Sequence, residues 1–227
     1  HIADPLAASF YARSLRMRNK TDKVDAAVLS RMGYERRPRP SEDLPPALET
    51  LRAMTRQRDY LMNQFKSATL RAGELDAFPD MLRIQQTLVR QLARAIKQVD
   101  RRIARHLQAQ PELKAAVRRL QTIPGVGRLT AVIALSELGD LRRFNTSRQV
   151  ASFAGLNPKL FESGSSVHYQ TRLSKQGPSR VRKALYMSAM GVLRTQSTLR
   201  RFYDHLLAGG KSKMAALGAV MRKQIVL

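Results

Sequence analysis

Apolar residues recur at three- and four-residue steps over two long stretches of the chain, the spacing that places them on one face of a helix. The first stretch, interrupted only by Arg58, contains Leu51, Met54, Leu61, Phe65, Ala68, Ala72 and Leu75. The second follows a turn at Phe78-Pro79-Asp80 and contains Leu88, Leu92, Ala95, Val99 and Ile103. These heptad-like seams predict a coiled coil, either as an antiparallel hairpin or between two chains. Because the repeats are short, two ordinary bundle helices are the alternative.

The most obvious linker is rich in proline and contains Pro38, Pro40, Pro45 and Pro46. Before it lies a segment with a helix of about Thr21 to Met32, and from Arg118 the composition changes again. We therefore divide the chain into residues 1–46, 47–117 and 118–227. We expect a mainly α fold, with one short hairpin around Ser166 to Arg172.

Both ends of the chain look cut. It starts at His1 rather than at a methionine, and its first residues read like the end of a strand. Its last residues, from Gln224, stop inside an apolar helical pattern. We therefore expect a longer protein.

The chain is strongly basic, with 41 Lys and Arg against 17 Asp and Glu, a net charge of +24. Such an excess attracts polyanions, of which nucleic acid is the most common for a basic protein. The excess is concentrated in residues 118–227, which contain 19 basic and 4 acidic residues. An anionic membrane surface fits less well, because no basic face lies opposite an aromatic-rich face and no apolar run approaches the ~20 residues of a membrane span.

The chain contains no cysteine, which excludes disulfides, thiol catalysis and cysteine-based zinc sites. This composition fits a reducing cytoplasm. Hydrophobic residues make up 43% of the chain, enough for a genuine core.

A glycine-containing turn at Ile123-Pro124-Gly125-Val126-Gly127-Arg128 precedes a predicted helix. Glycines let the backbone approach a phosphate, and the free N–H groups at the start of the helix attract one. Gly125, Gly127 and Arg128 are therefore candidate nucleic-acid contacts. The alternative is a tight turn between two helices.

A loop of mostly small residues, Leu160-Phe161-Glu162-Ser163-Gly164-Ser165-Ser166-Val167-His168, lies between apolar segments. A serine beside glycine presents its hydroxyl group without steric cover, and nearby cations could hold the oxygens of a phosphate. The basic residues that follow are Arg172, Lys175, Arg180, Arg182 and Lys183. A flexible polar loop is the alternative, and the residue types do not choose among the three serines.

The segment Lys20-Thr21-Asp22-Lys23-Val24-Asp25-Ala26 places two carboxylates three residues apart, on one face of a helix. Two such groups can share a divalent cation through oxygen ligands. The alternative is that Thr21 or Asp22, together with Asp25, only caps the start of the helix.

The order of these motifs is more specific than any one of them. It runs K-T-D-K-V-D-A, a helical spacer, I-P-G-V-G, F-A-G-L-N-P, F-E-S-G-S-S and S-K-Q-G with R-K-A-L-Y. Over nearly its whole length the chain resembles the transposases of the insertion-sequence-110 family, including its 1111 subgroup. The resemblance implies an α/β RuvC-like (RNase H-like) domain with four acidic residues, then a coiled coil and a helical transposase domain. Residues 1–46 would be the C-terminal part of the RuvC-like domain.

The resemblance also assigns roles to residues of this chain. Asp22 and Asp25 match the third and fourth acidic positions, which implies a Mg²⁺ site, and Ser163 matches the catalytic serine. The first two acidic positions lie upstream in the family, so this chain alone should not catalyse. The implied partners are double-stranded target and donor DNA, a non-coding bridge (seeker) RNA, and further copies of the chain in a dimer or tetramer. The implied location is the bacterial cytoplasm, at the nucleoid.

Two functional hypotheses result. The first is a transposase that cuts and rejoins DNA through a phosphoserine intermediate, which needs no ATP and fits the absence of a P-loop motif. The second is a non-catalytic, basic architectural protein that binds nucleic acid. Both predict steep salt dependence of binding, and only the first predicts Mg²⁺-dependent covalent attachment to DNA.

Overall fold

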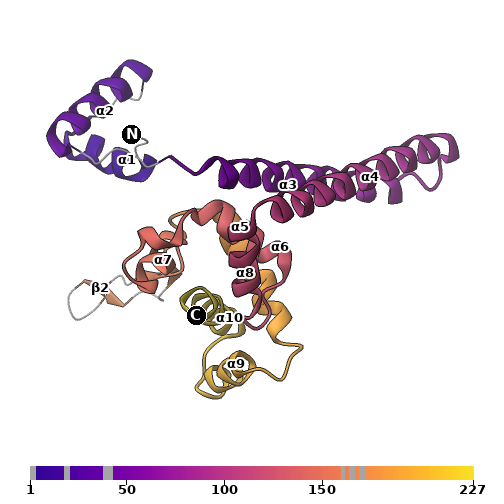
Figure 1. Ribbon diagram of the computed structural model, residues 1–227. Helices are drawn as coiled ribbons and strands as arrows, with labels where there is room; N and C mark the ends of the chain where they lie inside the picture. The colour runs from indigo at the N-terminus through magenta and orange to yellow at the C-terminus, as the bar shows by residue number, and fades with distance from the viewer. Residues whose placement is uncertain (1–3, 18–20, 38–42, 160–161, 164–166, 169–171) are drawn as a thin grey trace. The chain divides into compact units, whose positions relative to one another are not determined.

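The fold is almost entirely helical (Figure 1). The computed structural model describes residues 4–17, 21–37, 43–159, 162–163, 167–168 and 172–227. The described strands form two antiparallel sheets of two strands each. The mainly α fold predicted from the sequence is therefore confirmed. The chain divides into two compact units, His1–Asp43 and Leu44–Leu227.

The first unit contains helices α1 (Pro5–Ser14) and α2 (Asp22–Arg36), which pack around Tyr11. The Tyr11 hydroxyl donates to Oε2 of Glu35 at 2.5 Å, and the Arg36 guanidinium lies 5.4 Å from the centre of the Tyr11 ring. The predicted helix of this region is present as α2 and continues four residues beyond the expected end, whereas α1 was not predicted. The expected strand end falls on residues 1–3, outside the described residues.

The second unit begins with a long helical hairpin and continues as a bundle of shorter helices. Its helices are α3 (Pro46–Gly73), α4 (Pro79–Ala109), α5 (Pro111–Gln121), α6 (Arg128–Leu138), the 3₁₀ helix η1 (Leu141–Arg143), α7 (Ser147–Phe153), α8 (Ser179–Val192), α9 (Thr198–Ala208) and α10 (Lys213–Val226).

Local sequence explains where most of these helices begin. α1, α3, α4 and α5 each have proline in the first turn, where its fixed φ suits a helix and its missing N–H is not needed. α2, α7, α9 and α10 follow a Thr or Ser whose hydroxyl accepts from a backbone N–H of the first turn. The turn predicted at Phe78-Pro79-Asp80 lies a few residues earlier: it follows the end of α3 at Gly73 and reaches Phe78. Pro79 and Asp80 belong to α4, because the fixed φ of proline suits the first residue of a helix.

Helices α3 and α4 pack against each other along the hairpin, which we call the arm. Arg58, the residue that interrupts the apolar stripe of α3, donates from Nε to Oδ1 of Asp100 on α4 at 2.6 Å. The charge within the seam therefore has a partner on the opposite helix. The knobs-into-holes geometry of a coiled coil stays a prediction.

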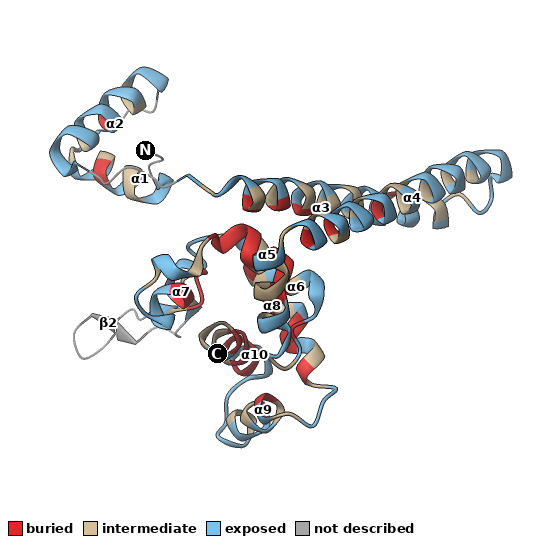
Figure 2. Cartoon of the chain, in the orientation of Figure 1, coloured by how far each residue is buried: buried red, intermediate tan, exposed pale blue. Residues whose placement is uncertain are grey.

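The core of the second unit has two clusters (Figure 2). One joins the base of the arm to α5 and α6 and includes Leu48, Leu51, Ile103, Leu107, Val117, Val126, Val132 and Leu135. The other lies mainly among α7, α8, α9 and α10 and includes Leu156, Val181, Leu185, Val192, Tyr203, Leu217 and Val220. The base of the arm is thus part of the helical domain, whereas its far end exposes Leu70, Phe78, Met81, Ile84 and Leu88.

A β-ribbon leaves the bundle between α7 and α8. Strand β1 (Pro158–Lys159) pairs with β4 (Arg172–Leu173), and β2 (Glu162–Ser163) pairs with β3 (Val167–His168), both antiparallel. The paired strands begin at Pro158, earlier in the chain than the hairpin expected around Ser166 to Arg172. Two-residue strands lack the alternating apolar pattern by which longer strands are predicted.

Candidate nucleic-acid interface

The turn between α5 and α6 contains one glycine that packing requires. Gly125 has φ of +82°, and a Cβ there would lie 2.6 Å from both the backbone oxygen of Ser188 and Cγ2 of Val192. The side chain of Gln224 donates to the Pro124 carbonyl oxygen at 2.9 Å and fastens the turn to α10. Gly125 thus brings the turn into close contact with α8, and whether it also contacts nucleic acid stays a prediction.

The other glycine of this turn lies at the open end of α6. Gly127 is its N-cap residue, no side chain caps the helix, and the space where a Cβ would lie is free. Arg128 follows as the first residue of the helix and is exposed. The N–H groups of the first turn and the positive end of the helix dipole are therefore open to an anion at this point.

The ribbon carries Ser163 away from the helical bundle. Ser163 lies in β2, and its register partner in β3 is Val167. The alternative nucleophiles, Ser165 and Ser166, lie outside the described residues. Arg172 lies in β4 and is exposed, and exposed Lys175 follows with a left-handed backbone at φ +55°. The sequence-predicted serine and two of its predicted cations therefore belong to one ribbon and its base.

The base of the ribbon is held by Arg182. Its Nη1 donates to the carbonyl oxygens of Ala154 and Gly177, each at 3.0 Å. At Gly177, where φ is +109°, a Cβ would lie 1.9 Å from the Phe153 carbonyl oxygen, so a side chain cannot fit. Burial lowers the pKa of the Arg182 guanidinium. The structure thus gives Arg182 a positioning contact that sequence reasoning missed, while its DNA contact stays a prediction.

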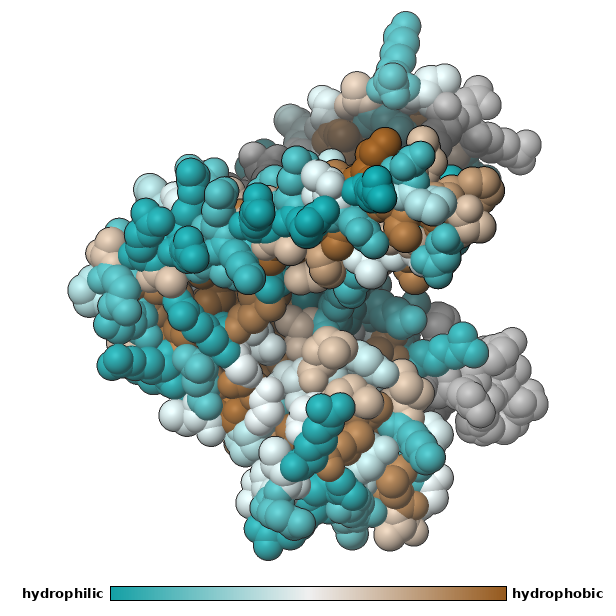
Figure 3. Space-filling model, turned by 90° about the vertical axis from the view of Figure 1, so that its right-hand side faces the viewer, coloured by the Kyte–Doolittle hydropathy of each residue, from teal (hydrophilic) through white to brown (hydrophobic). Residues whose placement is uncertain are grey.

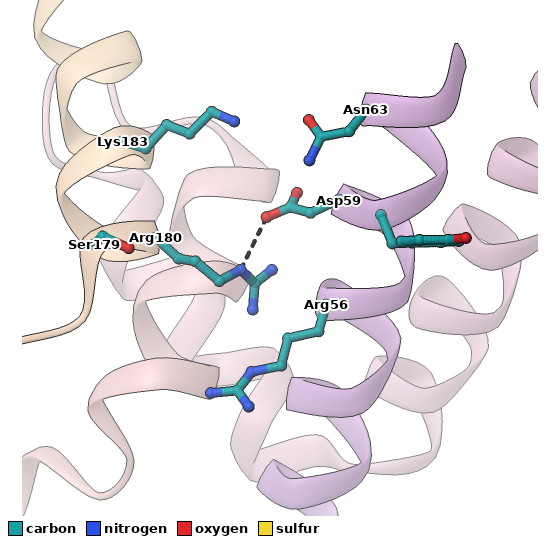
Figure 4. A pocket seen from close by; sticks show the side chains of 7 residues that line it. Arg56, Asp59, Asn63, Ser179, Arg180 and Lys183 are labelled. Atoms are coloured by element: carbon teal, nitrogen blue, oxygen red, sulfur yellow. Dashed lines mark hydrogen bonds and ion pairs between the residues drawn. The ribbon is translucent and has the colours of Figure 1, made fainter. Parts of the chain in front are cut away.

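Arg180 lies in a network of charged side chains that joins α3, α6 and α8. Figure 4 shows its pairing with Asp59 of α3. Its Nε donates to Oδ2 of Asp59 at 2.9 Å, and its Nη1 donates to Oε1 of Glu137. Arg56 donates to both oxygens of Glu137 at 3.1 Å. Sequence reasoning treated Arg180 as a phosphate contact and did not single out the other three residues.

Glu137 is the centre of this network and is only 7% exposed. Burial raises the pKa of its carboxyl group, but hydrogen bonds and positive charge from Arg56 and Arg180 outweigh burial and hold the pKa below its usual range. The carboxylate therefore stays charged in the folded protein. It was detectable as the lone acidic residue in the apolar helix A-V-I-A-L-S-E-L.

Further hydrogen bonds join α3 to the end of α6. Nε of Arg52 donates to the Ser136 carbonyl oxygen at 2.8 Å, and Oγ1 of Thr55 lies 3.3 Å from Oγ of Ser136. On α3 the polar positions 52, 55, 56, 59 and 63 recur at helical spacing. This polar stripe beside the apolar stripe is the signal from which the network could have been found.

The acidic pair lies in the first unit, in the first turn of α2. Oγ1 of Thr21 accepts the capping hydrogen bond from the Val24 N–H at 3.3 Å, so neither carboxylate is needed as the cap. Asp22 is exposed and Asp25 is half-buried, and neither carboxylate has a hydrogen-bond or ion-pair partner among the described residues. The two groups fit part of a divalent-cation site. Within the described residues no group of three or more candidate ligands is present.

Two families of transposases match the chain. The "Transposase IS116/IS110/IS902 family" matches residues 117–204, and a transposase family of the DEDD IS110 type matches residues 1–75. The pilin gene-inverting protein of Moraxella bovis is 31% identical over 227 residues, which are 100% of this chain and 70% of that protein. The chain belongs to the IS110 family of transposases.

Two further relatives agree with this assignment. The pilin gene-inverting protein of Moraxella lacunata has the same identity and coverage. The transposase for insertion sequence element IS1111A of Coxiella burnetii is 38% identical over 89 residues, 37% of this chain and 24% of that protein. The family predicted from the motif order is therefore confirmed, and the chain is a transposase, a class of enzyme that acts on DNA.

The net charge of +24 of this IS110 transposase suits a polyanionic substrate. Hydrophilic side chains cover much of the face seen in Figure 3, and apolar patches lie between them. The segment matched at residues 117–204 contains the glycine turn, the ribbon and the two C-terminal members of the charged network. Among the described helices, none is both long and apolar enough to cross a membrane.

Proposed function

We propose that this transposase cuts and rejoins the DNA of its insertion sequence through a covalent bond between Ser163 and a DNA phosphate. The observation that carries the proposal is the position of Ser163 in β2, within a ribbon whose last strand contains Arg172 and is followed by Lys175. The names of the Moraxella relatives, which describe inversion of a pilin gene, support a reaction that breaks and rejoins DNA.

The covalent step follows from the chemistry of a serine hydroxyl. Oγ of Ser163 attacks phosphorus, an Oγ–P bond forms and the bond from phosphorus to the 3′ oxygen breaks. The serine hydroxyl gives up its proton, and the departing 3′ oxygen leaves as a hydroxyl group after gaining one. The 5′-phosphoserine bond conserves the energy of the phosphodiester, so attack by another 3′-hydroxyl group rejoins the strands without ATP.

Cations of this chain have two roles in the proposed step. Arg172 and Lys175 offset the charge of the phosphate beside the serine. Gly127 and Arg128 hold the DNA backbone at the open start of α6. Such backbone contacts orient a duplex without reading its sequence.

We infer that Asp22 and Asp25 hold Mg²⁺, together with carboxylates that the family places upstream of this segment. Two carboxylates without partners in one helical turn suit a hard cation that prefers oxygen ligands. When bound, such an ion supplies positive charge that polarises a phosphate oxygen. The residues of this chain contribute two of its ligands.

The proposal includes two partners. A structured non-coding bridge RNA would select the DNA sites, since the phosphate contacts of this chain carry no sequence information. A second copy of the chain, in a dimer or tetramer, would bind at the far end of the arm. Exposed apolar residues gather there, and their burial would stabilise an intermolecular coiled coil.

The test is the Ser163→Ala variant of the full-length protein, incubated with guide RNA, Mg²⁺ and end-labelled DNA. Wild-type protein should form a protein–DNA adduct that survives denaturing electrophoresis, and Ser163→Ala should form none because it has no hydroxyl group to attack phosphorus. Matched Ser165→Ala and Ser166→Ala variants should keep the adduct. An adduct that persists in Ser163→Ala and disappears in one of the controls would show that the nucleophile is misassigned.

A further inference from the structure

A cleft of about 500 Å³ opens between α3 and the start of α8 (Figure 4). Helix α3 contributes Arg56, Asp59 and Asn63, and α8 contributes Ser179, Arg180 and Lys183. In Figure 4 the side chains of Lys183 and Asn63 extend from opposite sides toward the space between the two helices. The volume is within the roughly 300–1,000 Å³ of sites that hold small ligands.

The charges of the inner wall are largely paired, but Nη2 of Arg180 is buried and has no hydrogen-bond partner among the described residues. The carboxylate of Asp59 accepts from Nε of Arg180, and Arg180 and Arg56 also donate to buried Glu137. The ion pair between Arg180 and Asp59 is largely buried, with side chains only 20% and 30% exposed. The two arginines and the two carboxylates of this wall balance one another in charge, and the ion pair between Arg180 and Asp59 joins α8 to α3.

The outer part of the cleft has donors that lack acceptors. Lys183 and Asn63 are exposed, and neither these side chains nor the Ser179 hydroxyl bonds to any residue in the described part of the chain. Pro178, the N-cap residue of α8, provides no side-chain cap, so N–H groups of the first helical turn also remain available. An ammonium group, an amide, a hydroxyl group and the positive end of a helix dipole thus lie around one space.

This set of donors suits a ligand that is anionic and has several acceptor oxygens. The lining residues include three cations and one carboxylate, so a positive excess remains after the internal pairing. A phosphate offers non-bridging oxygens to an ammonium group, an amide and a hydroxyl group at once. Nucleic acid is the polymer that presents such groups to a basic DNA-acting enzyme.

We propose that the cleft binds a backbone phosphate of a nucleic-acid strand, with Lys183, Asn63 and Ser179 as its contacts. The choice of nucleic acid as the source rests on the proposed function. The site is separate from the open start of α6 and from the ribbon serine. Because α8 follows β4 directly in the chain, a strand held here is fixed relative to the base of the ribbon.

The test compares Lys183→Met with Lys66→Met, an exposed lysine on α3 that lies outside the cleft. Binding of fluorescein-labelled duplex DNA and of RNA of equal length is measured over a range of salt concentrations. One phosphate contact contributes about 0.9 to the slope of log K against log salt for duplex DNA and about 0.7 for a single strand. In Lys183→Met the slope should become shallower by that amount, and binding at 0.1 M salt should be about 5- to 10-fold weaker. In Lys66→Met the slope and the affinity should stay as in the wild type.

The probe that loses the increment identifies the bound polymer. Asn63→Leu should weaken binding about threefold with an unchanged slope, since an uncharged amide releases no counterion. Equal slopes for Lys183→Met and Lys66→Met with both probes would overturn the proposed site. Circular dichroism and thermal melting verify that each variant folds, as expected for exposed positions.

The serine–DNA adduct separates this inference from the proposed function. If the wild-type protein forms an adduct and the salt slope of Lys183→Met is unchanged, the proposed phosphate site in the cleft is wrong and the covalent mechanism is supported. If the salt slope of Lys183→Met is reduced and the wild-type protein forms no adduct, the phosphate site is supported and the covalent mechanism is wrong.

Discussion

Gly125 and Gly127 lie two residues apart in one turn but do different things. A side chain at Gly125 would meet the backbone of α8, whereas a side chain at Gly127 would meet open space. The sequence pattern predicted both as phosphate contacts, because the contact that constrains Gly125 comes from a helix about sixty residues further along the chain. A motif of this type therefore combines a packing glycine with a glycine at an open helix end.

Gly125→Ala should destabilise the protein by about 2–4 kcal/mol, because it adds a clash with backbone atoms to the strain of a positive φ. Gly127→Ala should cost less than about 1 kcal/mol, since its φ of −79° suits any residue. Urea denaturation of both variants provides the measurement. Equal stabilities would show that the turn does not press against α8.

Glu137→Gln tests the charged network at residue scale. The pKa of Glu137 is lowered in the folded protein, so its contribution to stability is present above the unfolded pKa, near 4.5, and is lost as pH falls toward the folded value. The substitution should therefore destabilise the protein by about 2–4 kcal/mol at pH 7 and by less near pH 3. Urea denaturation at both pH values measures the difference, with exposed Glu49→Gln as the control. A pH-independent difference would contradict the role given to the carboxylate.

At the scale of elements, the arm has two dissimilar ends. Its base belongs to a hydrophobic cluster with α5 and α6, and hydrogen bonds from α3 add to that attachment. Its far end exposes a row of large apolar side chains on α4, including Met81, Ile84 and Leu88. The apolar periodicity of the sequence is continuous through both ends of the arm, so it predicts the two helices. It does not show which of their apolar side chains pack against other helices of the same chain.

Replacing Ile84 and Leu88 together by glutamate should abolish self-association, because charge at the exposed apolar row opposes its burial. Sedimentation velocity should then report a smaller species than the wild type forms at the same concentration. Gln86→Glu, an exposed charge change on the same helix, should leave the oligomer intact. A variant that sediments like the wild type would exclude this row as the contact between copies.

At the scale of the whole molecule, local patterns predicted more than long-range pairs did. Helices α2, α3, α4 and α6 and the start of α8 were predictable from apolar spacing, glycine and proline. The pairing of Arg180 with Asp59 joins residues 121 apart, and that with Glu137 joins residues 43 apart. No local pattern specifies such partners, and so a basic residue expected at the surface proved to be half-buried inside a network.

The attachment of the arm has a mechanical consequence. Helix α4 has 31 residues and rises about 46 Å, while α3, the other helix of the arm, is joined through Asp59 to α8, the helix that follows the ribbon. A rigid arm of that length acts as a lever, so a small tilt at its base displaces its far end by several ångströms. If two copies bind each other at the far ends of their arms, the arms would couple the positions of the two ribbons. Loss of the ion pairs between α3 and α8 would then weaken this coupling.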